Sequence, residues 1–231
     1  MSARTIRLAL ALATSLALTG CTNPRPLHVV QASADRFYML ERYNDAIPEL
    51  VEYNSRKPND PEMRYKLGKS YINTENPKAA REHMNVAVDV APTVDKYMDG
   101  YAEALLKSGE SDQMLISLRQ RTSDRGTVAD YLRLGQFASR VGHADEALTA
   151  LKTAARLDAG KSVGPQLALA SFYASVNDKP NEIRRLRMAT WIAPANIQAN
   201  ERLRELGEIP GPSQAIQPEE WAPMTEGTPK K

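Results

Sequence analysis

The residues best suited to chemistry are few in this chain of 231 residues, and they stand far apart. Cys21 is the single cysteine, so the chain cannot form an internal disulfide or a cluster of thiolate ligands. The histidines are not spaced so that they could hold a zinc ion together; they are His28, His83 and His143. We therefore expect no metal site and no cofactor.

Carboxylates occur in adjacent pairs, such as Asp145 with Glu146 and Glu219 with Glu220. Neighbours in sequence do not face each other on a helix, so these pairs cannot work as a general acid and base across a cleft. The chain also lacks the GxSxG, GxxxxGK[ST] and HExxH motifs of common hydrolases, nucleotide-binding proteins and zinc proteases. The sequence therefore predicts a protein that is not an enzyme.

Composition favours helices and gives no sign of a nucleic-acid partner. Hydrophobic residues make up 42% of the chain and aromatic residues only 6%, which favours helices over sheets. The net charge is +2, and without residues 1–20, which contain Arg4 and Arg7, 28 basic residues face 28 acidic ones. Nucleic-acid binders usually concentrate an excess of Lys and Arg on one element.

The N-terminal segment has the pattern of a secretory signal. Residues 1–7 are short and positively charged, and residues 8–18 are apolar apart from Thr14 and Ser15. This run is too short to span a membrane, which takes about 20 apolar residues. The LTGC motif that ends at Cys21 resembles the lipobox of bacterial lipoproteins.

That resemblance implies cleavage before Cys21 and lipidation of its thiol, often with acylation of the new amino group. Two or more acyl chains anchor a protein stably where one is marginal. Residues 1–20 would then be the signal peptide and residues 21–26 an acylated tether. The protein would lie in the bacterial cell envelope, at the outer membrane facing the periplasm if the organism has two membranes. The alternative is an ordinary cleaved signal with a chance cysteine.

From residue 27 on, the sequence repeats with a period near 34 residues, most clearly over residues 61–94. Pro61 suits a helix start, Pro77 follows a turn, and Pro92 closes a second helix. Small residues recur where two antiparallel helices must approach closely, and large ones fill the gaps; the pattern consists of Leu67, Gly68, Tyr71, Ala80, Met84 and Ala87. It resembles the tetratricopeptide repeat (TPR) family. The resemblance implies an all-α fold, a right-handed solenoid whose helical hairpins bury their apolar faces by stacking.

Matching positions along residues 27–207 predict about five hairpins and a C-terminal capping helix. The third hairpin departs from the pattern, because Met114 and Arg121 replace the packing alanines. In the fifth, Glu182 replaces an alanine, so we expect that hairpin to splay.

The C-terminal segment, residues 208–231, is rich in proline and is predicted to be disordered. Trp221 lies within it. Its side chain either docks on the solenoid or on a partner, or it is a sparse anchor without such a role. A homo-oligomer that uses Trp191 or Trp221 at its interface is a further alternative.

The first helices of such a solenoid line a concave groove, which is where the resemblance implies binding. Aromatic side chains there would supply contact area, and Lys and Asn would bind backbone or carboxylate groups. The candidates are Asp35, Tyr38, Tyr65, Lys69, Asn73, Glu103, Lys107, Gln136 and Arg140, with Met39, Asp99, Leu132, Leu167 and Ser171 on the same face. The carboxylate clamp of some family members has a spacing that these residues lack, so that function is not carried over.

Together these features predict a membrane-anchored TPR lipoprotein that scaffolds envelope proteins by binding a protein or peptide segment in its groove. An envelope enzyme or carrier with a solenoid substrate-binding body is the alternative.

Overall fold

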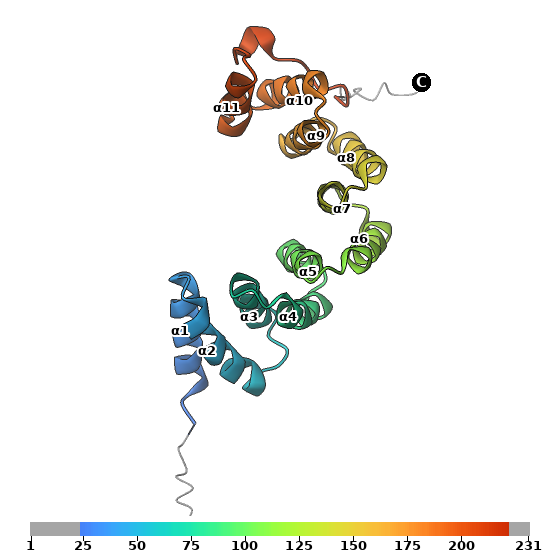
Figure 1. Cartoon of the computed structure of the whole chain (residues 1–231). Coiled ribbons are helices and arrows are strands. Elements are labelled where there is room, and N and C mark those ends of the chain that lie inside the picture. Colours follow the sequence, from blue (N-terminus) through green and yellow to red (C-terminus); the bar gives the residue numbers. More distant parts are fainter. Residues whose placement is uncertain (1–23, 222–231) are drawn as a thin grey trace, which may run out of the picture.

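A computed structural model describes residues 24–221, where it places eleven α-helices, one short 3-10 helix and no strand (Figure 1). The elements are α1 (Leu27–Met39), α2 (Tyr43–Arg56), α3 (Pro61–Asn73), α4 (Pro77–Val90), α5 (Asp95–Lys107), α6 (Ser111–Arg125), α7 (Val128–Arg140), α8 (Ala144–Asp158), α9 (Gly164–Ser175), α10 (Lys179–Ile192), α11 (Ile197–Glu205) and η1 (Pro212–Gln214). The first ten helices form five hairpins, and α11 packs against α10 as a cap. The predicted all-α solenoid is therefore confirmed. Cys21 and the signal segment lie outside the described residues.

Several helices begin at the residues that the sequence pattern indicates. The Asp60 side chain accepts a hydrogen bond from the backbone N–H of Met63 at 3.2 Å, and Asn76 caps α4 in the same way. Proline follows each cap at the first helical position, where its missing N–H has no partner to lose.

Each hairpin turns at one residue with left-handed backbone angles. These residues recur with roughly the 34-residue period of the sequence; they are Glu41 (φ 56°), Glu75 (φ 59°), Gly109 (φ 78°), Gly142 (φ 81°) and Asn177 (φ 58°). Glycine adopts this conformation freely, whereas a residue with a side chain loses about 1–2 kcal/mol. The repeat thus sets the geometry of the turn even where the residue is not glycine.

The close approach of neighbouring helices is clearest around Met84. A Cβ atom added at Gly68 on α3 would lie 2.8 Å from the Met84 Cγ, and one at Gly100 on α5 would lie 2.8 Å from its Sδ. The Met84 side chain, fully buried, therefore fills a slot between two glycines that belong to successive hairpins. Gly135 on α7 likewise leaves room for the Leu151 side chain of α8, because a Cβ atom added at Gly135 would lie 2.6 Å from the Leu151 Cγ.

The stacked hairpins curve around a hollow (Figure 1). The first helices of the middle hairpins, α3, α5 and α7, face this hollow, and α4, α6 and α8 lie on the outside (Figure 1). Within residues 24–221, no helix is long and apolar enough to cross a bilayer.

The third hairpin is the loosest of the five. Its first helix, α5, packs mainly against α4 and much less against its own partner α6. Met114 is fully buried in the core of this region, so a large side chain stands where the first, second and fourth hairpins have a buried alanine. A hollow of about 740 Å³ opens beside it between α4, α5 and α6.

A buried charge network joins α5, α6 and α7 where the third hairpin is loose. The fully buried Asp130 carboxylate of α7 receives Arg121 Nε at 2.9 Å and Arg133 Nη1 at 3.1 Å. Arg121 and Arg133 also reach Asp95 and Asp99 on α5, at 2.9 Å and 2.5 Å. Arg121, which interrupts the repeat pattern, is thus paired with a residue of the next hairpin. The network also holds α5 and α6, two of the helices that line the hollow of about 740 Å³.

The fifth hairpin does not splay, contrary to the expectation from Glu182. Its helices α9 and α10 pack as closely as those of the first hairpin. The Glu182 side chain points instead toward α11, where its Oε1 lies 2.6 Å from Arg202 Nε. The charge is therefore paired with the capping helix and leaves the hairpin contact intact.

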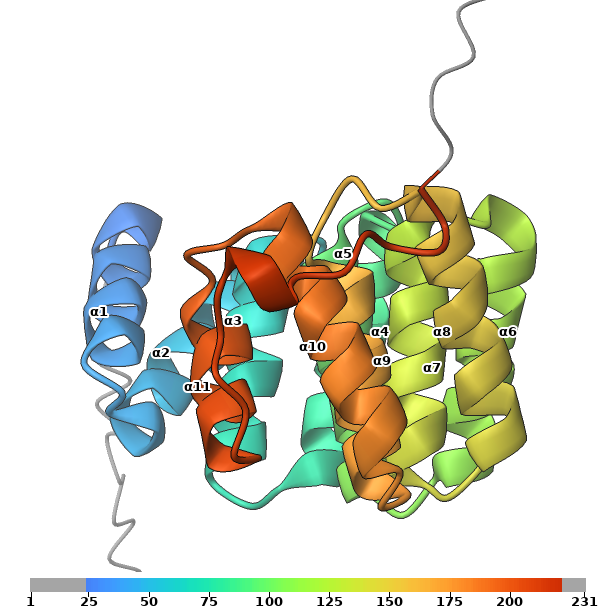
Figure 2. The ribbon, with the colours of Figure 1, turned by 90° about the horizontal axis from the view of Figure 1, so that it is seen from above.

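The C-terminal segment also differs from the prediction over residues 208–221. This part runs back across α10 toward the end of α8 (Figure 2). Glu208 pairs with Arg187, and Trp221 packs edge-to-face on Trp191 with ring centroids 5.0 Å apart. Ion pairs and aromatic contacts hold it, which a composition rich in proline does not reveal. Residues 222–231 lie outside the described residues.

Candidate protein-interaction surface

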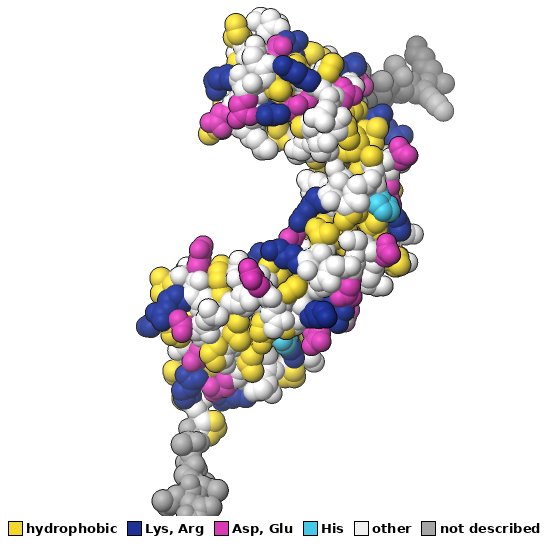
Figure 3. Space-filling view, viewed as in Figure 1, with side chains coloured by type: hydrophobic (Ala, Val, Ile, Leu, Met, Phe, Trp, Pro, Cys, Tyr) yellow, Lys and Arg dark blue, Asp and Glu magenta, His cyan; other side chains and the backbone are white. Residues whose placement is uncertain are grey.

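Five of the nine predicted groove residues lie together in one hollow at the middle of the concave face. Side chains from α3, α5 and α7 line this hollow of about 390 Å³, here called the central hollow; they are Tyr65, Lys69, Ile72, Asn73, Asp99, Glu103, Lys107 and Phe137. Gly100 forms part of its wall, where the close packing on Met84 leaves no side chain. Figure 3 shows basic side chains gathered on this inner face.

The two carboxylates of the central hollow are already occupied by arginines of α7. Arg140 Nη1 lies 2.6 Å from Glu103 Oε2, and Arg133 Nε lies 2.5 Å from Asp99 Oδ1. The hydrogen bond from Arg140 lowers the pKa of Glu103 and outweighs its partial burial. Glu103 is therefore ionised at neutral pH, and both carboxylates are paired with an arginine of α7.

The two lysines of the central hollow have no such partner. Among the described residues, no carboxylate lies within ion-pair distance of Lys69 or Lys107. Both lysines lower the pKa of Glu103, which places positive charge on the same side of the hollow. Because the charges of Asp99 and Glu103 are balanced by arginines, the two lysines give the central hollow a net positive charge.

Asp35 and Tyr38 lie on α1, next to the central hollow but outside its lining. Lys66 of α3 joins them, because its Nζ lies 2.7 Å from Asp35 Oδ1 and 6.0 Å from the centre of the Tyr38 ring. Burial raises the pKa of Tyr38 to about 12. Asp35 and Tyr38 therefore extend the polar and aromatic surface of the groove onto the first hairpin.

Gln136 and Arg140 on α7 have different positions. Gln136 is exposed and does not line the central hollow. Arg140 reaches the hollow indirectly, through Glu103 and by lying 4.9 Å above the centre of the Phe137 ring. The Asn73 side chain lines the hollow, and its Nδ2 donates to the carbonyl oxygen of Lys69 at 2.8 Å.

Phe137 and Ile72 were missed as groove residues, and the signal for Phe137 was available. It precedes Arg140 by three positions and so shares its helical face. Both are buried against the hairpin core, which makes them the apolar floor of the hollow. The hollow therefore offers an apolar floor, two ammonium groups and an amide, a combination suited to binding a peptide that carries a carboxylate. Within the described residues, no group of His, Cys, Asp and Glu is arranged to hold a metal ion.

Comparison with known proteins agrees with the repeat pattern. Residues 61–94 match the family model described as a tetratricopeptide repeat. None of the curated proteins matches the chain. Proteins built of this repeat generally mediate protein–protein interactions and are typically scaffolds rather than enzymes.

The fold resembles that of solved TPR proteins. A TPR protein of Thermus thermophilus superimposes with a TM-score of 0.57 at 20% identity, over 78% of this chain and 98% of that one. MamA gives 0.54 at 17% identity, over 78% and 94%, and MamA of Desulfovibrio magneticus gives 0.55 at 16%, over 74% and 97%. At such low identities the likeness shows the fold, so the chain is a solenoid of the TPR type.

Proposed function

We propose that the protein is a membrane-anchored scaffold of the bacterial cell envelope that binds an acidic segment of a partner protein in its concave groove. The unpaired lysines of the central hollow, Lys69 and Lys107, carry this proposal. A carboxylate between them would replace water around two cations that have no acidic partner within residues 24–221, and the floor of Ile72 and Phe137 would bury an apolar side chain beside it.

The anchor belongs to the same proposal. The LTGC motif at Cys21 supports lipidation there, and the solenoid begins at Leu27, only a few residues further on. An acylated Cys21 would therefore hold the first hairpin close to the membrane surface. Growth with a labelled fatty acid tests this half; label should appear on the wild-type chain and vanish in Cys21→Ser.

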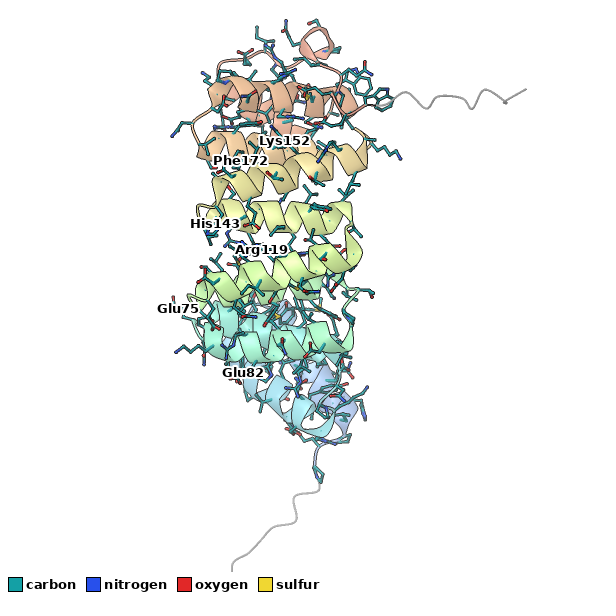
Figure 4. All side chains as sticks on the ribbon, turned by 90° about the vertical axis from the view of Figure 1, so that its right-hand side faces the viewer. Glu75, Glu82, Arg119, His143, Lys152 and Phe172 are labelled. Carbon is teal, nitrogen blue, oxygen red and sulfur yellow. The ribbon has the colours of Figure 1, made fainter. Side chains whose placement is uncertain are left out.

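The groove is tested by photo-crosslinking in membranes. A photoreactive amino acid at Asn73 lies in the central hollow, and one at Glu82 lies on the outer side of α4 (Figure 4). We expect a crosslinked partner at position 73 that is absent at position 82. Lys69→Gln with Lys107→Gln should reduce this crosslink at least tenfold, whereas Lys78→Gln on α4 should leave it unchanged. Equal crosslinking at both positions, or no effect of the lysine pair, would contradict the groove as the binding site.

A further inference from the structure

The last residues that the structure describes form a strap on the outer surface of the fourth and fifth hairpins. This strap, defined as residues 215–221, crosses α10 and ends beside the C-terminus of α8 (Figure 2). Near its start, the backbone N–H of Ile216 donates to the carbonyl oxygen of Arg187 at 3.2 Å. Further along, the side chains of four consecutive residues, Pro218 to Trp221, contact the hairpins beneath.

Glu220 fills a socket made by two buried polar side chains. Arg185 Nη1 lies 2.7 Å from Glu220 Oε1, and Gln166 Nε2 donates to Oε2 at 3.2 Å. Arg185 also donates to Gln166 Oε1 at 3.0 Å, which orients the amide so that its N–H group faces the carboxylate. The side chain of Arg185 is only 7% exposed and that of Glu220 9%. Glu219 of the strap also lies 3.8 Å from Arg185, so without the strap Arg185 would be a buried cation with no carboxylate within ion-pair distance among the described residues.

Two further contacts recognise the neighbours of Glu220. Pro218 lies over Gly160, where an added Cβ would come within 3.2 Å of the proline ring, so a side chain at residue 160 would push the strap away. The Trp221 ring meets Trp191 of α10 edge-to-face, at an interplanar angle of 71°. A proline slot, a carboxylate socket and an indole contact thus follow one another along the surface.

The surface holds more positive charge than the strap neutralises. A hollow of about 560 Å³ lies between the strap and α8, lined by Lys152 and Arg156 together with Arg185, Glu219 and Glu220. Lys152 lies on the outer surface seen in Figure 4. Among the described residues, neither Lys152 nor Arg156 has a carboxylate within ion-pair distance. A ligand with more acidic residues than the strap would therefore find cations that the strap leaves unused.

The connection to the strap allows it to leave without disturbing the helices. The socket residues Gln166 and Arg185 belong to α9 and α10, and the strap is linked to α11 through residues 209–214. Ile209 in this linker is 82% exposed, and Pro210 and Gly211 continue it without helical structure up to η1, which begins at Pro212.

We propose that the surface formed by Gly160, Gln166, Arg185 and Trp191 is a second peptide-binding site, which takes an acidic segment of the pattern Pro-acid-Glu-Trp. The strap is its built-in ligand and shows which sequence the surface accepts. A partner protein that carries such a segment, flanked by further acidic residues, displaces the strap and uses Lys152 and Arg156 as well. This site lies on the outer side of the last hairpins and is independent of the central hollow.

The test uses a fluorescent peptide with the sequence of residues 214–221, QAIQPEEW, and the chain from residue 22 onward, which keeps every described helix. A tethered strap competes at an effective concentration in the millimolar range. We therefore expect the peptide to bind a released variant, Glu220→Gln with Trp221→Ala, at least tenfold more tightly than the wild-type chain in fluorescence polarisation. A peptide with glutamine in place of the second glutamate, QAIQPEQW, should bind the released variant at least tenfold more weakly.

Controls separate recognition from general charge attraction. Arg185→Gln and Trp191→Ala, each in the released variant, should abolish peptide binding. Arg184→Gln, which removes only the exposed pair with Glu219, and Lys69→Gln in the groove should change it less than threefold. Trp191 is partly exposed, so its replacement keeps the test valid should Arg185→Gln unfold the chain, which circular dichroism would show. Failure of the peptide to bind the released variant, or equal binding of the two peptides, would overturn the proposal.

Discussion

Replacing Asp130 by asparagine tests whether the buried charge network holds the third and fourth hairpins together. Asparagine has nearly the same shape and keeps one side-chain oxygen, so the capping box with Thr127 can survive. The change removes the negative charge that Arg121 and Arg133 share inside the molecule. Any large loss of stability therefore comes from the lost charge and from the hydrogen bonds that Oδ1 accepts from the two arginines.

The expected loss can be worked from the burial of the three side chains. Asp130 is fully buried, and the side chains of Arg121 and Arg133 are 8% and 4% exposed. Removing one member of such a group costs about 3–5 kcal/mol, because it leaves buried charge uncompensated. Both arginines keep a partly exposed carboxylate on α5, so we expect a value near the lower end, about 3 kcal/mol.

Asp145→Asn is the matched control. Asp145 also lies in the first turn of a helix, α8, but it is exposed. Its replacement loses only the favourable interaction with the helix N-terminus, about 0.3–1 kcal/mol. Urea unfolding followed by circular dichroism at pH 7 should therefore separate the two variants by about 2 kcal/mol or more. A difference below about 1 kcal/mol would refute the view that this network, rather than apolar packing, secures the loose third hairpin.

Three further predictions concern packing, turns and pH. Gly135→Ala should destabilise the chain relative to Gly164→Ala by about 1–3 kcal/mol in urea unfolding. A Cβ atom at residue 135 would clash with Leu151, whereas one at residue 164 would lie 4.0 Å from its neighbour Leu132. Equal stabilities would contradict the close packing of Gly135 on Leu151. Glu75→Gly at the hairpin tip in Figure 4 should raise the free energy of unfolding by about 0.5–1 kcal/mol by relieving the left-handed backbone, and a loss would argue against strain there. The wild-type chain should lose stability as pH falls below about 4, because the pKa of Asp130 is lowered in the folded state. Burial alone would raise this pKa, but the hydrogen bonds from Thr127 and Arg121 outweigh it. Its folded state then binds fewer protons than the unfolded chain, and denaturation curves at pH 7, 4.5 and 3 should show a weaker decline in Asp130→Asn.

The sequence predicts the hairpins well because their packing depends on local, periodic features. Gly68 and Gly135 stand at equivalent positions, and each accommodates a large side chain of the following helix. A period near 34 residues fixes where such slots occur, so helix order and the concave face can be placed without coordinates. Among the candidate groove residues, those on α3 and α5 do come together in the central hollow.

The features that the sequence did not predict all depend on pairs from different hairpins or segments. Arg121 reads only as a break in the repeat until Asp130 is found beside it. In the same way, the sequence alone indicates that the charge of Glu182 disturbs the packing of the fifth hairpin. The structure shows that this charge is paired with Arg202 of the capping helix. The strap is the extreme case, because Glu220 owes its place to Arg185, which lies far away in the sequence. Periodicity says nothing about such partners, since they occur once.

The two charged residues that interrupt the repeat pattern both connect neighbouring units of the solenoid. Arg121 and Glu182 each stand where the repeat pattern expects a small residue, and each pairs with a residue outside its own hairpin. Small residues thus hold the two helices of a hairpin together, whereas these charges join one unit to the next. The Arg121–Asp130 pair is buried, so it loses its stabilisation when its partners move apart by a few ångströms, whereas Arg202 in the second pair is 42% exposed and its pair with Glu182 is partly screened by water. The charge pairs therefore connect successive units: Arg121 links the third hairpin to the fourth, and Glu182 links the fifth hairpin to the capping helix.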